Sequence, residues 1–227
     1  MSKKLSTKDI KTGGGGVSKT FQPGNTLAKI RAVRLDEFKF RENAYHLILD
    51  MEGPDLGADF EGFFIDKDNE SLGRHKGQVG QVKASEWAYS DGETKSGIPV
   101  SRDIEILKFL KSLCKALDIE DWLEKNDSKH DTIEAYIKAF NKDKPFKDKF
   151  IEYCIGGKEY VNRGGYTNYD LFLPKFVKGA APFGTTRVIK YDESAHLRKK
   201  KEDTVSEFGE DTTVVSGAAG EDFAIGD

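Results

Sequence analysis

The hydrophobic pattern of this chain changes its period twice, and the order of the patterns limits the folds that it can adopt. From Leu27 to Leu35 apolar residues alternate with basic or polar ones, as in a half-buried strand. Strand-like segments continue to residue 89, helical spacing begins near Ser101, and strand patterns resume at residue 149. Strands and helices do not alternate, so the pattern argues against a doubly wound parallel sheet.

The helical part is expected to contain two helices. The first begins at Ser101, a candidate N-cap, and extends to about residue 118. The second covers roughly 131–141 and is preceded by a capping-box pattern at Ser128–Asp131. Strands are predicted at 27–35, 44–53, 59–66, 77–89, 149–157 and 187–193, with a strand-loop-strand over 157–176.

This order predicts a mainly β fold of the α+β class, an OB-like five-stranded barrel with two helices inserted between strands. A β-sandwich with a helical excursion is the alternative. We expect the helix at 101–118 to plug the barrel, and a dimer contact is the alternative, which leaves a homo-oligomer open. The expected organisation is a flexible basic and Gly-rich arm at 1–20, a barrel domain at 21–196 with its helical insert at 101–141, and a disordered acidic tail at 197–227.

Composition excludes several classes of protein. No run of 18 apolar residues is present, and no apolar stretch follows the first lysines, so neither a membrane span nor a secretion signal is expected. Cys114 and Cys154 lie far apart without a CxxC motif, which favours two buried thiols in a reducing cytoplasm. The expected location is cytoplasmic, or the host cytoplasm for a phage protein.

The net charge of −3 conceals an asymmetry between the body and the tail. Residues 201–227 contain eight acidic residues and one lysine, a net charge of −7. The remaining 35 basic and 31 acidic residues give residues 1–200 a net charge of +4. A mildly basic body with an acidic tail is compatible with an anionic ligand, and equally with a tail that only aids solubility.

Catalytic and cofactor motifs fail on inspection. The stretch GGGGVSKT at 13–20 resembles a phosphate-binding loop, but Ser18 replaces the second glycine, and neither a strand nor a helix flanks it. The four histidines are scattered, and Asp55 and Glu61 lack the lysine that completes a nuclease motif. We therefore expect no enzyme activity, no catalytic residues, no metal site and no cofactor.

Rings and cations are concentrated in GKEYVNRGGYTNYDLFLPKF, residues 157–176. Proteins that bind single-stranded nucleic acid present aromatic side chains for base stacking beside a positive groove for the phosphates. Cations alone line the first strand, and residues 74–89 combine cations with Trp87 and Tyr89. The candidate nucleic-acid-binding residues are Lys29, Arg31, Arg34, Arg74, Lys76, Lys83, Trp87, Tyr89, Lys158, Tyr160, Arg163, Tyr166, Tyr169 and Lys175.

The alternative interpretation of the same segment is an irregular hairpin that closes a core. We expect Leu171, Phe172 and Leu173 to anchor the core while the tyrosines and cations face the ligand. Phenylalanines are more often core residues than stacking surfaces. On that ground Phe60, Phe63, Phe64, Phe172 and Phe176 are assigned to the core.

The acidic tail contains two apolar residues that a purely solvating tail would not need. A docking peptide would insert Phe223 and Ile225 into a partner's pocket, while Glu221 and Asp222 meet a basic rim. We therefore predict a partner-binding role for these four residues.

A strand-rich OB-type body with a hydrophobe in an acidic C-terminal tip resembles phage-type single-stranded DNA-binding proteins. The segments GPDLGADFEGFFIDK, GQVGQVKASEWAY and NYDLFLPKF are similar to those of large gut bacteriophages. The resemblance implies protection of single-stranded DNA during phage replication and recombination, with the tail recruiting replication or recombination proteins. The tip departs from the bacterial pattern, because Glu221-Asp222-Phe223-Ala224-Ile225 lacks a proline and two residues follow it.

Two other functions remain open at this point. A structural, scaffolding or virion-associated protein would use the same aromatic surface for protein contacts. An enzyme acting on nucleic acid is the third alternative, which the missing carboxylate cluster disfavours.

Overall fold

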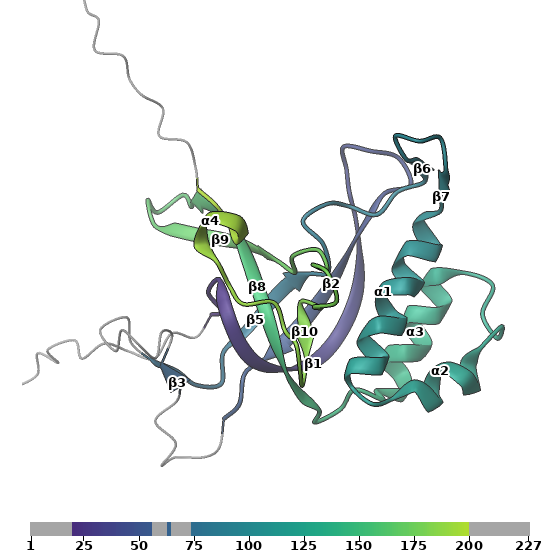
Figure 1. Cartoon of the computed structure of the whole chain (residues 1–227), viewed down its shortest axis with the longest axis horizontal. Helices are drawn as coiled ribbons and strands as arrows, with labels where there is room; N and C mark the ends of the chain where they lie inside the picture. Colours follow the sequence, from purple (N-terminus) through teal and green to yellow (C-terminus); the bar gives the residue numbers. More distant parts are fainter. Residues whose placement is uncertain (1–19, 56–62, 65–73, 200–227) are drawn as a thin grey trace, which may run out of the picture.

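Five strands close into a barrel (Figure 1) in the computed structural model, which describes residues 20–55, 63–64 and 74–199, with the backbone alone at 63–64 and 74–75. The order around the barrel is β1-β2-β5-β9-β8, and β8 pairs with β1 again. This confirms the predicted α+β fold with an OB-like barrel. The barrel strands are β1 (Gly24–Glu37), β2 (Tyr45–Glu52), β5 (Val79–Lys83), β8 (Phe150–Val161) and β9 (Thr167–Phe172).

The pairing between β5 and β9 is the only parallel one among the barrel strands, and it consists of a single rung, Lys83 opposite Phe172. The Leu173 amide donates to the Lys83 carbonyl (2.8 Å) just beyond this rung. The helices lie in the sequence between the third and fourth barrel strands, β5 and β8. Strand order, the parallel pair and the position of the insert together give the OB arrangement.

Four positions in register form a row across the outside of the barrel. Arg34 lies opposite Ile48, Ile48 opposite Lys83, and Lys83 opposite Phe172. Alternate residues of β2, such as Leu47 and Leu49, belong to the main buried core instead. We call the outward-facing side of β1, β2 and β5 around this row the barrel face.

Three helices cover one side of the barrel (Figure 1), opposite the β8–β9 hairpin. Apolar residues of α1, including Ile106, Leu110 and Leu113, are buried in the same core as the strands. The rings of Trp122 and Phe140 join α2 to α3 with a centroid separation of 4.9 Å. The helices are α1 (Arg102–Ala116), α2 (Glu120–Asn126), α3 (Ile133–Asp143) and the short α4 (Glu193–His196).

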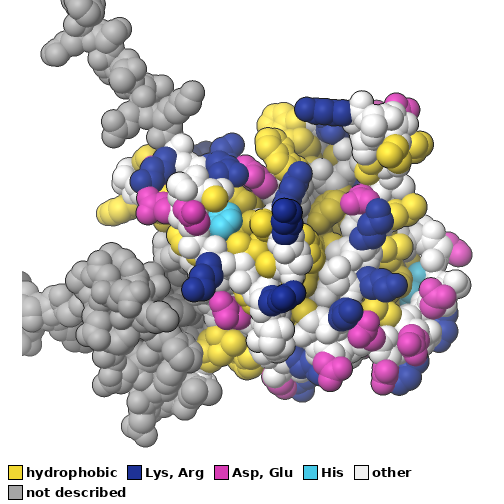
Figure 2. Space-filling view, in the orientation of Figure 1, with side chains coloured by type: hydrophobic (Ala, Val, Ile, Leu, Met, Phe, Trp, Pro, Cys, Tyr) yellow, Lys and Arg dark blue, Asp and Glu magenta, His cyan; other side chains and the backbone are white. Residues whose placement is uncertain are grey.

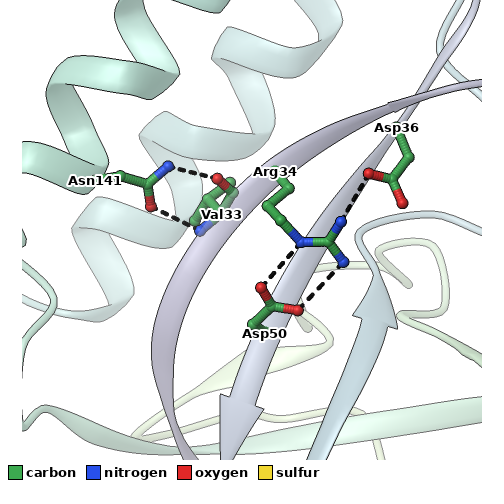
Figure 3. A network of polar contacts seen from close by, with 5 residues as sticks. All are labelled: Val33, Arg34, Asp36, Asp50 and Asn141. Atoms are coloured by element: carbon green, nitrogen blue, oxygen red, sulfur yellow. Dashed lines mark hydrogen bonds and ion pairs between the residues drawn. The ribbon is translucent and has the colours of Figure 1, made fainter.

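One side chain of α3 binds the backbone of β1. The amide of Asn141 accepts from the Val33 N–H (2.8 Å) and donates to the Val33 carbonyl (2.5 Å) (Figure 3). At Val33 the second edge of β1 is no longer paired with β8, because that pairing ends at Lys29. The carboxamide thus takes the place of a neighbouring strand at this edge.

The C-terminal segment crosses the outside of β8. Its two-residue strand β11 (Leu197–Arg198) runs parallel to Gly157 and Lys158, and the His196 carbonyl lies close against Gly156. A Cβ on Gly156 would lie 2.9 Å from that carbonyl and 2.8 Å from the Phe172 ring, so only glycine fits between them. The remaining short strands are β3 (Phe63–Phe64), β4 (Arg74–His75), β6 (Gly92–Glu93), β7 (Pro99–Val100) and β10 (Phe183–Gly184).

Most predicted elements are confirmed, including the strand-loop-strand at 157–176 with its buried anchor Leu171, Phe172 and Leu173. The predicted strand at 187–193 is wrong. Arg187 has a φ of 55°, which interrupts an extended chain, and the Asn25 side chain binds the Ile189 carbonyl and the Tyr191 amide in place of a strand ladder.

Three smaller expectations also need correction. Helix α2 was not predicted, and the N-cap of α3 is Thr132, whose hydroxyl accepts from the Ala135 amide (3.2 Å), rather than the Ser128 pattern. Phe176 was assigned to the core but is 53% exposed. The core assignments of Phe60, Phe63 and Phe64 concern side chains outside the described part of the chain.

Both cysteines are buried and free, as predicted. Burial raises the pKa of the Cys114 and Cys154 thiols to about 12. No helix in the described ranges is long and apolar enough to cross a lipid bilayer.

Candidate nucleic-acid interface

Most of the predicted cations on the barrel are paired with carboxylates. Lys29 contacts Asp148 (3.3 Å), and Arg31 contacts Glu52 (3.6 Å). Because a paired cation gains less from a phosphate, these two are weaker candidates than the sequence suggested.

The two cations nearest the centre of the barrel face are paired as well. Arg34 lies between Asp50 (3.0 Å) and Asp36 (2.9 Å), as Figure 3 shows, and Lys83 contacts Asp170 (2.5 Å). In the view of Figure 2, Lys and Arg side chains are scattered among Asp and Glu over the described surface and do not gather in one patch.

The structure says less about Arg74 and Lys76, the two candidate cations that precede β5 in the sequence. Lys76 contacts Asp55 at 3.5 Å. Arg74 belongs to β4, and its side chain lies outside the described part of the structure.

Three predicted cations are exposed and make no ion pair with any described residue: Lys158, Arg163 and Lys175. Lys158 lies on β8 opposite Asp170, whose carboxylate is already paired with Lys83. Arg163 lies in the loop that joins β8 to β9, and Lys175 follows β9. These side chains are the best placed to meet phosphates.

The β8–β9 loop has a defined geometry that presents Tyr166. The Asn162 side-chain oxygen accepts from the Gly164 amide (2.9 Å) and the Tyr166 amide (3.0 Å), and Gly165 adopts a φ of 80°. Tyr166 is 73% exposed, and Tyr160 on β8 is 48% exposed. A tight turn therefore holds one large ring open to solvent.

The Trp87 side chain is also exposed, at the end of the barrel face near the β1–β2 loop. It follows β5 and is 66% exposed. Two residues later, Tyr89 exchanges both backbone hydrogen bonds with Tyr45 at the start of β2 (2.9 and 2.8 Å). Trp87 is thus fixed close to the loop that joins β1 to β2.

Two of the predicted rings are not open in this way. Tyr89 and Tyr169 are partly buried and pack against the main core. Burial raises the pKa of Tyr89, with a further contribution from the charge of Glu105. The structure therefore favours Tyr160, Tyr166 and Trp87 over these two as stacking surfaces.

The sequence interpretation overlooked Phe40, which is 90% exposed in the β1–β2 loop. Its ring lies edge-on to Phe38 at 5.5 Å between centroids. The stretch Phe38-Lys39-Phe40-Arg41 alternates rings and cations, the pattern that drew attention to residues 157–176, so the signal was available.

The open rings flank the barrel face from opposite ends. β5 runs from Val79, opposite Glu52, toward Lys83, opposite Ile48, and so toward the β1–β2 loop that contains Phe40. β9 is parallel to β5, so its first residues and the preceding loop with Tyr166 lie at the far end. OB barrels use this face and these two loops to bind oligonucleotides and oligosaccharides.

Among the described residues, no three His, Cys, Asp or Glu side chains are arranged so that they could hold a metal ion. The candidate tail residues Glu221, Asp222, Phe223 and Ile225 lie outside the described ranges.

The chain matches no protein-family model, no curated protein and no solved structure. The case for a function therefore depends on the geometry of this chain alone.

Proposed function

We propose that this protein binds and protects single-stranded DNA, as in phage replication and recombination, without catalysing a reaction. The observation on which the proposal depends is the set of open rings, Phe40, Trp87 and Tyr166, at the two ends of an OB barrel face. Each ring that stacks on a base contributes about 1–3 kcal/mol. Lys158 and Arg163, which make no ion pair with a described residue, lie on the same hairpin as Tyr166, where the phosphates of a bound strand would be within reach.

The first test is fluorescence anisotropy of a labelled strand of about 30 nucleotides, compared with a duplex of equal length, at low and physiological salt. The proposal expects tight single-strand binding that weakens with salt and much weaker duplex binding. Absence of binding to either ligand at low salt would refute it.

Variants locate the ligand on the barrel. We expect Trp87→Ala and Tyr166→Ala each to weaken single-strand binding by about 1–3 kcal/mol without lowering the unfolding temperature. Ile104→Ala is the control, because Ile104 is 53% exposed and lies on α1, outside the barrel strands. Equal affinities of all three variants and the wild type would remove the stacking assignment.

The acidic tail is assigned to the recruitment of replication or recombination proteins. Deletion of 201–227 removes a net charge of −7, so DNA binding should stay the same or become tighter at low salt. A large loss of DNA affinity on deletion would contradict this assignment.

A scaffolding role is the second candidate, because apolar side chains are also exposed on the helical side. Ile98, Ile104 and Leu107 are 61%, 53% and 39% exposed. Such a protein would sediment as a large defined assembly and show no salt-dependent affinity for an oligonucleotide.

A further inference from the structure

On the β1 side of the barrel face, three of the five N–H groups of Arg34 are engaged by carboxylates. Its Nε and Nη2 atoms donate to the two oxygens of Asp50 (3.0 and 3.4 Å), and its Nη1 atom donates to Asp36 (2.9 Å) (Figure 3). A bidentate pair of this kind fixes the plane of the guanidinium. The side chain nevertheless remains 38% exposed.

A second arginine of the same protein shows what such an arrangement permits. Arg102 donates its Nε to Asp103 (2.6 Å), and its guanidinium carbon lies 4.8 Å from the centre of the Tyr45 ring. The side chain of Arg102 is only 15% exposed. In Arg102 the Asp103 carboxylate binds the N–H edge of the guanidinium, and the Tyr45 ring lies over its flat face. At Arg34 carboxylates also bind the edge of the guanidinium, here through three N–H groups, and the side chain is more than twice as exposed.

The local charge makes Arg34 a poor phosphate ligand. Arg34, Asp36 and Asp50 together have a net charge of −1, and Asp36 and Asp50 flank the guanidinium on both sides. A phosphate would approach a net negative cluster and would find three of the five N–H groups already bound to carboxylates. A base needs only the flat surface, because arginine planes stack on unpaired bases.

We propose that Arg34 is a fixed stacking surface for one nucleobase on the β1 side of the barrel face, in register with Ile48, with Asp50 and Asp36 as the residues that hold it in place. This inference depends on the proposed function and specifies how its ligand is bound. It places a base between the open rings at the two ends of the face, and it separates Arg34 from the residues that contact phosphates.

The first experiment replaces the planar cation by a non-planar one. Arg34→Lys keeps the charge and loses the plane, so it should bind a 30-nucleotide single strand about tenfold more weakly than the wild type. With a strand of abasic nucleotides, the two proteins should bind equally. Unchanged affinity of Arg34→Lys for the base-containing strand would overturn the proposal, because a phosphate ligand tolerates this exchange.

The second experiment holds the charge constant. The double variant Arg34→Met/Asp50→Asn keeps the local net charge at −1 and should also lose about tenfold in affinity. The slope of log K against log salt should match that of the wild type, since no phosphate contact is lost. A slope reduced by about 0.7, the value expected for one lost phosphate contact, would assign Arg34 to a phosphate instead.

The outcomes distinguish this inference from the proposed function. If the wild type binds single-stranded DNA and both Arg34 variants bind it with the affinity of the wild type, the stacking role fails and the proposed function stands. If the wild type binds no single strand, the function fails and the inference fails with it. Circular dichroism and the unfolding midpoint of each variant confirm that a loss of affinity does not come from unfolding.

Discussion

At the scale of single residues, ion pairing decides which cations are available to a polyanion. Lys29, Arg31 and Lys83 each contact a carboxylate, whereas Lys158 and Arg163 contact none among the described residues. Sequence alone could not separate these groups, because the partner of Lys29 is Asp148, 119 residues away. A positive charge count therefore overestimates the phosphate-binding surface.

The salt dependence of DNA binding should follow this division. Lys158→Ala and Arg163→Ala should each reduce the slope of log K against log salt by about 0.7, because each removes one phosphate contact. Lys29→Ala is the matched control and should leave the slope within about 0.2 of the wild-type slope, because its ion pair with Asp148 keeps it from contacting a phosphate. A larger effect of Lys29→Ala than of the other two would contradict the ion-pair assignment.

The Tyr153 hydroxyl is buried in the barrel core and makes no hydrogen bond within the described part of the chain. A buried hydroxyl without a partner costs its desolvation free energy, so Tyr153→Phe should not lower the free energy of unfolding and can raise it by up to about 1 kcal/mol. Urea denaturation measures this. Tyr153→Leu is the contrasting variant and should lose about 2–4 kcal/mol through the cavity that it leaves. A loss above about 1 kcal/mol for the Phe variant would show that the hydroxyl is bound in solution.

At the scale of elements, the helical insert and the barrel hold each other through both apolar burial and the Asn141 amide. The two bonds from Asn141 to Val33 join α3 to the unpaired edge of β1. They fix the position of a helix that the sequence could only place between two strands.

Removal of this amide should destabilise the whole barrel. We expect Asn141→Ala to lower the free energy of unfolding by about 1–3 kcal/mol, because the partly buried N–H and carbonyl of Val33 lose their partners. Lys142→Ala, at the exposed next position of α3, is the control and should change it by less than about 0.5 kcal/mol. Equal midpoints for the two variants in urea would show that water replaces the amide without cost.

Hydrophobic periodicity within a segment predicted the strands and helices that do not depend on distant residues. Alternation from Leu27 to Leu35 predicted β1, and helical spacing after Ser101 predicted α1. Errors arose where a distant residue decides the conformation. The segment 187–193 is rich in strand-forming residues, but Asn25, over 160 residues earlier, takes its hydrogen bonds.

The candidate site was predicted less completely than the fold. Ring and cation clusters indicated Trp87, Tyr160 and Tyr166, which are open, and also Tyr89 and Tyr169, which are partly buried in the core. Period-2 alternation cannot say which face is covered when a strand belongs to a closed barrel. Exposure of a ring is a property of the assembled barrel and not of its own segment.

At the scale of the whole molecule, two histidines couple stability to pH. The Nδ1 atom of His196 accepts from the Asp192 amide (2.9 Å), which requires a neutral ring. Burial lowers the pKa of His196, the charge of Asp192 partly offsets this, and Arg198 adds to the lowering. His46 has a lowered pKa for the same first reason, burial, with Lys83 adding to it.

Stability should therefore fall as the solution becomes acidic. Well above pH 6.5, the ordinary pKa of these side chains, both rings are neutral in the folded and unfolded states. Below it the unfolded chain takes up protons that the folded chain resists, so the free energy of unfolding decreases as pH falls from 6.5 toward the lowered pKa values. Urea midpoints at pH 8, 6 and 5 measure the decline.

A double variant tests whether His46 and His196 cause the loss of stability in acid. His196→Asn keeps an acceptor for the Asp192 amide without a titrating group, and combined with His46→Gln it should flatten the decline between pH 6.5 and 5. If the double variant and the wild type decline equally, carboxylates and not these histidines control the acid sensitivity.

β8 contacts four other strands, and its register with β1 joins Gly24 to Ile155 and Lys29 to Phe150. The barrel therefore cannot close during synthesis until the complete helical insert has left the ribosome. At a synthesis rate of about 5–20 residues per second, β1 waits on the order of 6–25 s for its partner. Throughout that interval one edge of a long, half-apolar strand is open to other chains, and a nascent chain of this protein depends on its helices, or on a chaperone, to cover that edge.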